Sequence, residues 1–122
     1  MIVLVSGSRH WKDEQLVIDV LSKFPSGTTI VHGDAIGADT IAHVVAEELG
    51  FKIVKYPVSR DDWKKMGKAA GPIRNKKMLL ETNPDVVVAF LDESASSPGT
   101  KNMIKTAESY GYEVIVIRPL SV

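Results

Sequence analysis

A turn of small residues followed by an arginine comes after the first apolar run of the chain. Gly7, Ser8 and Arg9 stand directly behind the β-branched run at 2–6. Glycine lets backbone N–H groups approach an anion closely, the serine hydroxyl adds a hydrogen-bonding group, and arginine adds a fixed positive charge. An ordinary strand-to-helix turn with a solvated arginine explains the same residues equally well. Taken alone, this segment leaves anion binding and simple turn formation as alternatives.

A second glycine-rich segment, HGDAIGAD at 32–39, places two carboxylates around two glycines. Gly33 and Gly37 allow unusual backbone angles and expose the N–H groups of the helix that follows. Asp34, beside a glycine turn, is suited to accept hydrogen bonds from ribose hydroxyls, whereas Asp39 is expected to be a helix N-cap. The histidines are given lesser roles: His32 as a strand-end residue, and His10 and His43 as surface residues.

A third segment, SSPGTKN at 96–102, has the composition of a helix start that receives a phosphate. Ser97, Gly99 and Thr100 combine hydroxyls with unpaired backbone N–H groups at the positive end of a helix dipole. Ordinary helix capping is the alternative. The segment lacks the Walker A order, and the chain has no G-x-G-x-x-G pattern, which disfavours ATP hydrolysis and standard NAD binding.

A fourth segment, GPIRN at 71–75, lies in a stretch with helical character. A helix needs only a capping residue and at most a proline in its first turn, so local chemistry explains Pro72. Arg74 and Asn75 have no such explanation. They are either solvent-facing helix residues or side chains that reach a site formed elsewhere in the fold.

The elements that position these segments alternate between strands and helices. Strand-length apolar runs occupy 2–6, 28–32, 52–58, 85–91 and 113–117, and segments with helical periodicity connect them. Near-continuous apolar strands joined by helical crossovers predict a parallel sheet with helices on both faces, that is, a doubly wound Rossmann-like α/β fold. Ligands of such sheets bind beyond the carboxyl ends of the strands, where the strand order reverses. We therefore expect the βα loops to carry the function.

Composition excludes several classes of protein. The chain has 122 residues, which fits a single domain spanning 1–122, and its formal net charge is zero. A protein that coats nucleic acid through phosphate contacts normally has a basic excess, so a nucleic-acid partner is disfavoured. The absence of cysteine removes thiolate and zinc-thiolate chemistry and suits a reducing cytoplasm. The N-terminal apolar run is too short to span a membrane, so we expect a cytoplasmic protein without a membrane partner.

Taken together, these segments resemble the SLOG superfamily, the Rossmann-like group that unites DNA-processing proteins of the Smf/DprA type with the LOG phosphoribohydrolases. The chain is most similar to the small single-domain YspA-like branch, and the resemblance covers nearly all of it. It implies a five-stranded sheet in the order 3-2-1-4-5. It also implies that Arg74 and Asn75 point toward the crevice formed by the Gly7 and Gly99 loops, with Arg74 contacting a phosphate or ribose. The segments that carry the resemblance are 7–9, 33–39, 71–75 with Met78, and 97–100 with Met103.

One departure from the family pattern bears on catalysis. The LOG enzymes carry P-G-G-x-G-T-x-x-E, and aligning its Gly-Thr with Gly99 and Thr100 places Met103 at the glutamate that serves N-glycosidic cleavage. Hydrolysis by that route is therefore doubtful. Asp34 and Glu81 are weak substitutes as a nucleophile or base, so whether the chain is an enzyme stays open.

The leading hypothesis is a domain that binds a small nucleotide or nucleotide-derived signal, as a sensor or a sequestering protein. The alternatives are an N-glycosidase acting on nucleosides or their monophosphates and, third, a single-stranded DNA binder. No cofactor and no metal are expected. The remaining expectations concern packing: Met66, Met78 and Met103 in the core; Trp11 and Trp63 stacked on a base or at an interface; and a homo-oligomer formed near Tyr56, Trp63 and Met66.

Overall fold

The computed structural model describes residues 1–120 and contains a five-stranded parallel sheet in the order β3-β2-β1-β4-β5. This confirms the predicted fold class and strand order. β1 is one residue longer than its predicted run, and the other four strands are shorter than theirs. The largest difference is at 52–58, because Pro57 has no backbone N–H to continue a ladder. The bounds of the strands are β1 Ile2–Gly7, β2 Thr29–His32, β3 Lys52–Lys55, β4 Val86–Phe90 and β5 Val114–Ile117.

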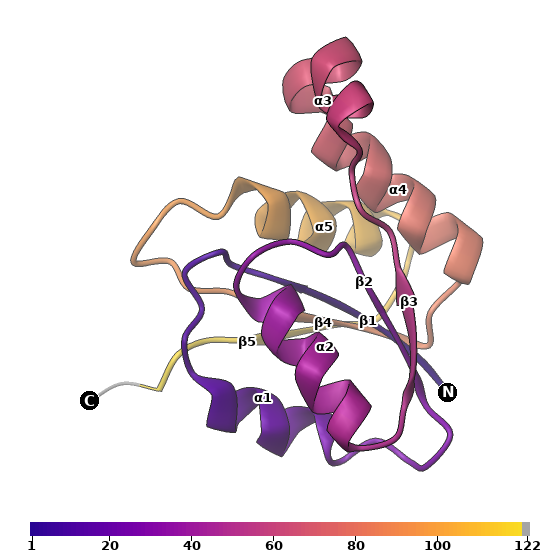
Figure 1. Ribbon diagram of the computed structural model, residues 1–122, viewed down its shortest axis with the longest axis vertical. Coiled ribbons are helices and arrows are strands. Elements are labelled where there is room, and N and C mark those ends of the chain that lie inside the picture. Colours follow the sequence, from indigo (N-terminus) through magenta and orange to yellow (C-terminus); the bar gives the residue numbers. More distant parts are fainter. Residues whose placement is uncertain (121–122) are drawn as a thin grey trace.

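Helices cover both faces of the sheet (Figure 1). α1 (Glu14–Leu21) and α2 (Ala38–Glu48) pack on one face, and α4 (Ala70–Thr82) and α5 (Pro98–Ser109) pack on the other. Successive side chains of a strand point to opposite faces, so Val3 and Val5 of β1 join the first core cluster while Leu4 joins the second. At the carboxyl ends of the strands, the loops provide the cover instead, and Ser8, Gly33 and Leu91 there are buried.

A short helix that the sequence did not predict lies between β3 and α4. α3 (Arg60–Met66) and the 3₁₀ turn η1 (Gly67–Ala69) project from the body at the top of Figure 1, and neither has a buried residue. A helix without a buried face has no apolar period, which is why the pattern gave no signal. α4 then begins at Ala70, so Pro72 lies within the first turn, where its missing N–H removes no helical bond.

Three expectations about large side chains are settled by burial. Met78 and Met103 are fully buried core residues, as predicted, but Met66 is only half-buried on the projecting α3. Trp11 is 3% exposed and packs against Phe90 with the ring centroids 5.3 Å apart. The hypothesis that Trp11 stacks on a base or covers an interface is therefore wrong, whereas Trp63 is exposed.

Within residues 1–120, no helix has the length and apolar character needed to cross a membrane.

Candidate functional site

The segments singled out in the sequence meet at the carboxyl edge of the sheet. The strand order reverses beside β1, which pairs with β2 on one side and β4 on the other. The loops after these three strands therefore lie next to one another at this edge, where α2, α4 and α5 also begin. This is the place where doubly wound sheets bind ligands.

Three of the four predicted site glycines are needed for packing between loops. A Cβ on Gly7 would collide with the Cβ of Ala38, and one on Gly33 would collide with the guanidinium of Arg74. Gly37 has a φ of 92°, and a Cβ there would strike the carbonyls of the loop after β1. Gly99 differs from these, because a Cβ there would meet no atom within 4 Å. Only Gly99 thus opens onto free space.

Two buried hydroxyls close a small ring of hydrogen bonds between the loops after β1 and β4. The Oγ atoms of Ser8 and Ser97 are 2.6 Å apart, the Asp92 N–H donates to Ser8 Oγ (2.9 Å), and Ser97 Oγ donates to the Asp92 carbonyl (3.1 Å). Each hydroxyl has one proton, so Ser8 must donate to Ser97. Both protons are already used, and these serines hold the loops together.

Arg74 joins the carboxyl ends of β2 and β3. Its Nη1 donates to the carbonyls of Gly33 (2.6 Å) and Tyr56 (3.0 Å), and its Nε donates to Asn75 Oδ1 (3.0 Å). Burial lowers the pKa of Arg74, while the nearby Asp39 raises it. Arg74 is half-buried, so the description of a solvent-facing arginine is wrong. Within residues 1–120, Nη2 is the side-chain nitrogen of Arg74 that makes no hydrogen bond.

Asn75 connects Arg74 to the start of α5. Its side chain is 2% exposed, and Nδ2 donates to the Gly99 carbonyl (3.2 Å) and to Asn102 Oδ1 (3.1 Å). With Oδ1 accepting from Arg74, three of its four hydrogen-bonding positions are occupied by the protein itself. Asn75 therefore positions the first turn of α5.

Asp39 has a different place from the predicted N-cap. The N-cap of α2 is Gly37, and the buried Asp39 carboxylate accepts from the N–H groups of Gly33 (3.1 Å) and Ala35 (3.3 Å) through Oδ2. Its Oδ1 is buried and has no hydrogen-bond partner among the described residues. Burial raises the pKa of Asp39 to about 6, although the two N–H groups and Arg74 favour the charged form. Asp39 stabilises the loop rather than the helix end.

His32 is a buried strand-end residue, as predicted, and it supports Asp34. Its Nδ1 accepts from the Asp34 N–H (2.9 Å), and its Nε2 lies 2.9 Å from His43 Nδ1. Burial lowers the pKa of His32 to about 4, with His43, Lys55 and Arg74 acting in the same direction and Asp34 against them. His10 is exposed as expected, but His43 is half-buried and bonded, so its description as a surface residue is wrong.

The opposite pKa shifts of His32 and Asp39 predict a pH dependence that a single substitution reveals. Between pH 4 and 6.5 the unfolded chain binds the His32 proton more strongly, so this residue makes stability rise with pH. Between pH 3.8 and 6 the folded chain binds the Asp39 proton more strongly, so this residue makes stability fall as pH rises. The two contributions nearly cancel in the natural chain.

Asp39→Asn should therefore gain stability relative to the natural chain as pH rises from 4 to 6.5, by on the order of 2–3 kcal/mol over the window. Urea unfolding of both proteins at several pH values measures this difference. Stability curves that stay parallel across the window would show that the Asp39 carboxyl is not held in its protonated form.

The first turn of α5 is partly exposed at this edge of the sheet. Its N-cap, Ser97, makes no side-chain bond to the helix, Pro98 occupies the first position, and Gly99 is exposed. Arg9 and Asp34 are exposed as well, whereas Thr100 is 3% exposed. Glu81 accepts a hydrogen bond from Tyr56 Oη (2.9 Å) and lies about 10 Å along the helix axis from Arg74.

Comparisons with known proteins agree with the fold and give the family of the chain. The model of the YspA, cpYpsA-related SLOG family (YAcAr) matches residues 1–65. The chain belongs to this family. The Gene 61 protein of Mycobacterium phage D29 is 38% identical over 120 residues, which cover 93% of each protein.

The X-ray structure of DNA processing protein A (DprA) from Streptococcus pneumoniae is a structural neighbour of this SLOG chain, with a TM-score of 0.57 and 18% identity. The match covers 94% of this chain but only 58% of the DprA chain. At this identity the likeness concerns the fold alone. The predicted membership of the SLOG superfamily, in its YspA-like branch, is confirmed.

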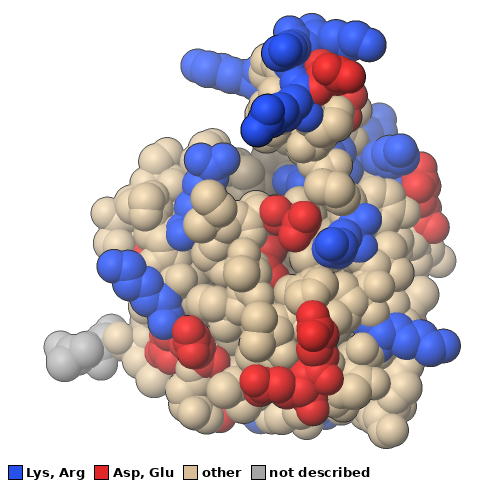
Figure 2. Space-filling model, in the orientation of Figure 1, with Lys and Arg blue, Asp and Glu red and all other residues tan. Residues whose placement is uncertain are grey.

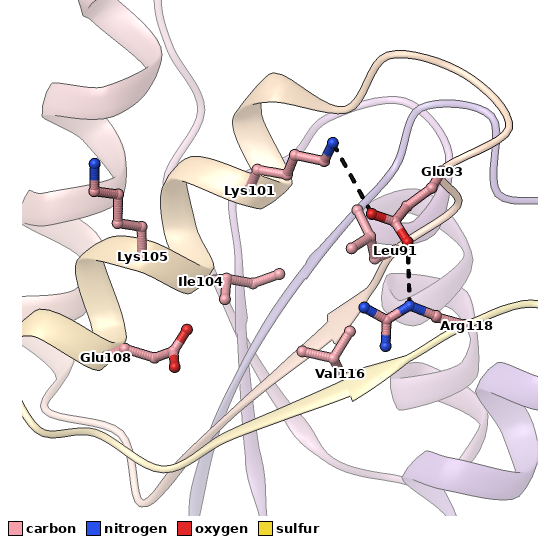
Figure 3. A pocket seen from close by; sticks show the side chains of 8 residues that line it. All are labelled: Leu91, Glu93, Lys101, Ile104, Lys105, Glu108, Val116 and Arg118. Carbon is pink, nitrogen blue, oxygen red and sulfur yellow. Dashed lines mark hydrogen bonds and ion pairs between the residues drawn. The ribbon is translucent and has the colours of Figure 1, made fainter.

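Among the surface hollows of residues 1–120 of the SLOG chain, two lie outside the first turn of α5. One, of about 450 Å³, is lined by residues that follow β1, β4 and β5, so it lies at the carboxyl edge beside the ring of serines. The other, of about 570 Å³, lies between α5 and β5 (Figure 3). Its Glu93 already pairs with Lys101 (4.0 Å) and Arg118 (3.3 Å), and all three are exposed. These three charges are solvated and paired with one another, which makes them poor anchors for a specific ligand.

Sequence reasoning missed several residues that build the site. The carbonyl of Tyr56, the side chain of Asn102 and the backbone of Asp92 are contacts that no local pattern announces. The one visible signal was the spacing of His43 and Glu47, which lie four apart on one helix and are bonded in the structure.

Proposed function

We propose that this chain is a cytoplasmic protein that binds a small nucleotide or nucleotide-derived signal at the carboxyl edge of the sheet. The observation that carries the proposal is the first turn of α5. Its N-cap, Ser97, gives it no side-chain hydrogen bond, and Gly99 opens it onto free space beside the reversal of strand order. Unpaired N–H groups at the positive end of a helix dipole are a phosphate site.

Charged groups around the crevice fit the other parts of a nucleotide. Arg9 is exposed on the loop that packs against Gly37, where it can pair with a second phosphate oxygen. Asp34 is exposed on the loop after β2, where its carboxylate can accept from ribose hydroxyls. Nη2 of Arg74 adds a further donor at a fixed position, because the other nitrogens of its guanidinium group are held by the protein.

Several features support binding rather than cleavage. Met103, which stands where the LOG enzymes carry their glutamate, is fully buried among core residues and presents no acid or base to the crevice. The Glu81 carboxylate is bonded to Tyr56 and lies away from the first turn of α5. We therefore favour a sensor or sequestering protein over an N-glycosidase.

The charge distribution supports a small ligand over a nucleic acid. The formal net charge is zero, and acidic and basic side chains are interspersed on the face shown in Figure 2. Arg60, Lys64 and Lys65 lie on the projecting α3 beside Asp61 and Asp62, and the other lysines and arginines of this face are spread apart rather than aligned in a stripe. A nucleic-acid strand normally follows a continuous basic groove.

We also propose that the chain self-associates through the projecting region. Trp63 of α3 is 45% exposed, and Ile73 and Leu80, which lie seven residues apart on one face of α4, are 50% and 44% exposed. Large apolar side chains left exposed on α3 and α4 could be buried against a second copy of the chain. Light scattering at tens of micromolar should give the mass of a dimer or larger, and Trp63→Ser should shift it toward the monomer. A monomer for both proteins would refute self-association.

The nucleotide proposal is tested by thermal shift against nucleotides, cyclic nucleotides and ADP-ribose. A ligand at 100 times its dissociation constant should stabilise the chain by about 2.7 kcal/mol. Gly99→Val should abolish this shift by placing a side chain over the first turn of α5, with little change in stability because the added atoms meet nothing. Ser109→Val, at the exposed far end of α5, is the matched control and should bind like the natural chain. Equal ligand shifts for both variants would place the ligand elsewhere.

A further inference from the structure

Two histidines outside the proposed ligand contacts form one line of hydrogen bonds with Asp34 and Glu47, which we call the histidine relay. The Asp34 N–H donates to His32 Nδ1 (2.9 Å), and His32 Nε2 lies 2.9 Å from His43 Nδ1. His43 Nε2 lies 2.6 Å from Glu47 Oε1. The relay runs from the ligand loop after β2 to the outer surface of α2, where the Glu47 side chain is 62% exposed.

The direction of every bond in the relay follows from its first donor. A backbone N–H can only donate, so His32 Nδ1 carries no proton and His32 Nε2 must carry one. His32 therefore donates to His43 Nδ1, which leaves the His43 proton on Nε2, facing Glu47. With both rings neutral, all three bonds form at once, and no other neutral arrangement of protons achieves this.

The bond at the loop end supports an uncommon backbone conformation. Asp34 has a φ of 57°, in the left-handed region that residues other than glycine seldom occupy. His32 is completely buried, so its ring is a fixed acceptor for the Asp34 N–H. The position of the exposed Asp34 carboxylate therefore depends on a hydrogen bond that His32 Nδ1 can accept only while it is unprotonated.

We propose that His32, His43 and Glu47 are positioning residues that hold Asp34 in its ligand-binding conformation, and that a proton taken up by the two histidines releases Asp34 and weakens nucleotide binding. The inference rests on the proposed function for the ligand and on the relay geometry for the mechanism. It makes affinity depend on residues that do not touch the ligand.

The same bond is lost whichever ring takes the proton. A proton on His43 Nδ1 makes that nitrogen a donor, so His32 Nε2 has to accept and the His32 proton moves to Nδ1, facing the Asp34 N–H. A proton added directly to His32 also occupies Nδ1. In either case two donors then face each other, and Asp34 loses the bond that holds its backbone.

The groups around His32 favour its neutral state at ordinary pH. His32 faces Lys55 from β3, Arg74 from α4 and His43 from α2, which all oppose a positive charge, and only Asp34 favours one. The buried Asp39 carboxyl bonds to the same loop through Gly33 and Ala35. The carboxylate that faces the outer ring is Glu47, whose Oε1 lies 2.6 Å from His43 Nε2.

Two substitutions separate the acceptor role from proton uptake. His43→Asn places an amide oxygen where Nδ1 stands, so it keeps the acceptor for His32 but cannot take up a proton at that place. His32→Phe removes the acceptor for Asp34 altogether. Stability measured by urea unfolding checks that both variants are folded at each pH.

The test combines nitrogen NMR on the free protein with ADP-ribose affinity, both from pH 7.5 to 5. ADP-ribose is the probe because its phosphates do not titrate in this range. At pH 7.5 both rings should be neutral with the proton on Nε2, and the Asp34 amide should be protected from exchange. On acidification the natural chain should lose the protection of the Asp34 amide, and its affinity for ADP-ribose should fall about tenfold. His43→Asn should keep both the protection and the affinity. His32→Phe should bind weakly throughout.

Three results would overturn the relay. The first is a proton on His32 Nδ1 at pH 7.5, and the second is an equal loss of Asp34 amide protection on acidification in the natural chain and in His43→Asn. The third is an ADP-ribose affinity that does not change with pH in parallel with the protection of the Asp34 amide. If ADP-ribose does not bind at any pH, the nucleotide proposal loses its support. The protonation of the two rings and the exchange of the Asp34 amide still test the relay in that case. Failure of the nucleotide proposal can therefore be distinguished from failure of the relay.

Discussion

Replacing Arg74 with alanine is expected to lower the free energy of unfolding by about 2–4 kcal/mol, a large part of the 5–15 kcal/mol typical of a domain. The guanidinium group satisfies the carbonyls of Gly33 and Tyr56 and holds Asn75, so its loss leaves polar groups of three elements without partners. It also removes the positive charge near the buried Asp39. Urea unfolding measures the change.

The matched control is Lys77→Ala, which removes a cation from an exposed position of the same helix. Its unfolding midpoint should stay close to that of the natural chain, because exposed charges contribute little. Arg74→Lys should fall between the two, since a single ammonium cannot reproduce the planar guanidinium fork. An Arg74→Ala midpoint equal to that of Lys77→Ala would show that Arg74 is not a structural link between β2, β3 and α5.

Gly37→Ala should be at least as damaging, for a different reason. The φ of 92° and ψ of −123° lie in a region that is nearly exclusive to glycine, and a Cβ there would strike the carbonyls of Ser8 and Arg9. We expect a loss on the order of 3 kcal/mol or more, because both the strain and the displaced β1 loop oppose folding. Nucleotide affinity should fall as well, since that loop carries Arg9.

Gly27→Ala isolates the strain from the collision. Gly27 has a similar φ of 86°, but a Cβ there would meet nothing within 4 Å. Its expected loss is about 1 kcal/mol, the usual effect of alanine at a left-handed position. If urea unfolding gave the same loss for both glycines, the contact between Gly37 and the β1 loop would make no contribution.

The sequence predicted the fold because each strand carries its own signal. The runs around Val3, Val31 and Val88 are apolar on both faces, as parallel strands covered by helices have to be. The strand order was not in these patterns, because five βα units can be arranged in several ways. It came from the family resemblance, and the pairing of β1 with β4 confirmed it.

The features that were not predicted are of two kinds: a helix without a buried face, and contacts between residues that the sequence pattern does not connect. α3 has no buried face and hence no period. Asp39 had the residue type of an N-cap, but the turn at Gly37 directs its carboxylate back to Gly33 instead. The bond between His32 and His43 joins a strand end to a helix, and no spacing rule connects those two places.

Nucleotide titration followed by backbone amide NMR tests the central proposal most directly. If the phosphate lies on the first turn of α5, the largest shifts should fall on the N–H groups of Gly99 and Thr100, with a second group at Asp34 and the loop after β1. The hollow between α5 and β5, at Lys105 and Val116, should remain unchanged. Shifts centred on that hollow, or no response to any nucleotide in the panel, would contradict the proposed function.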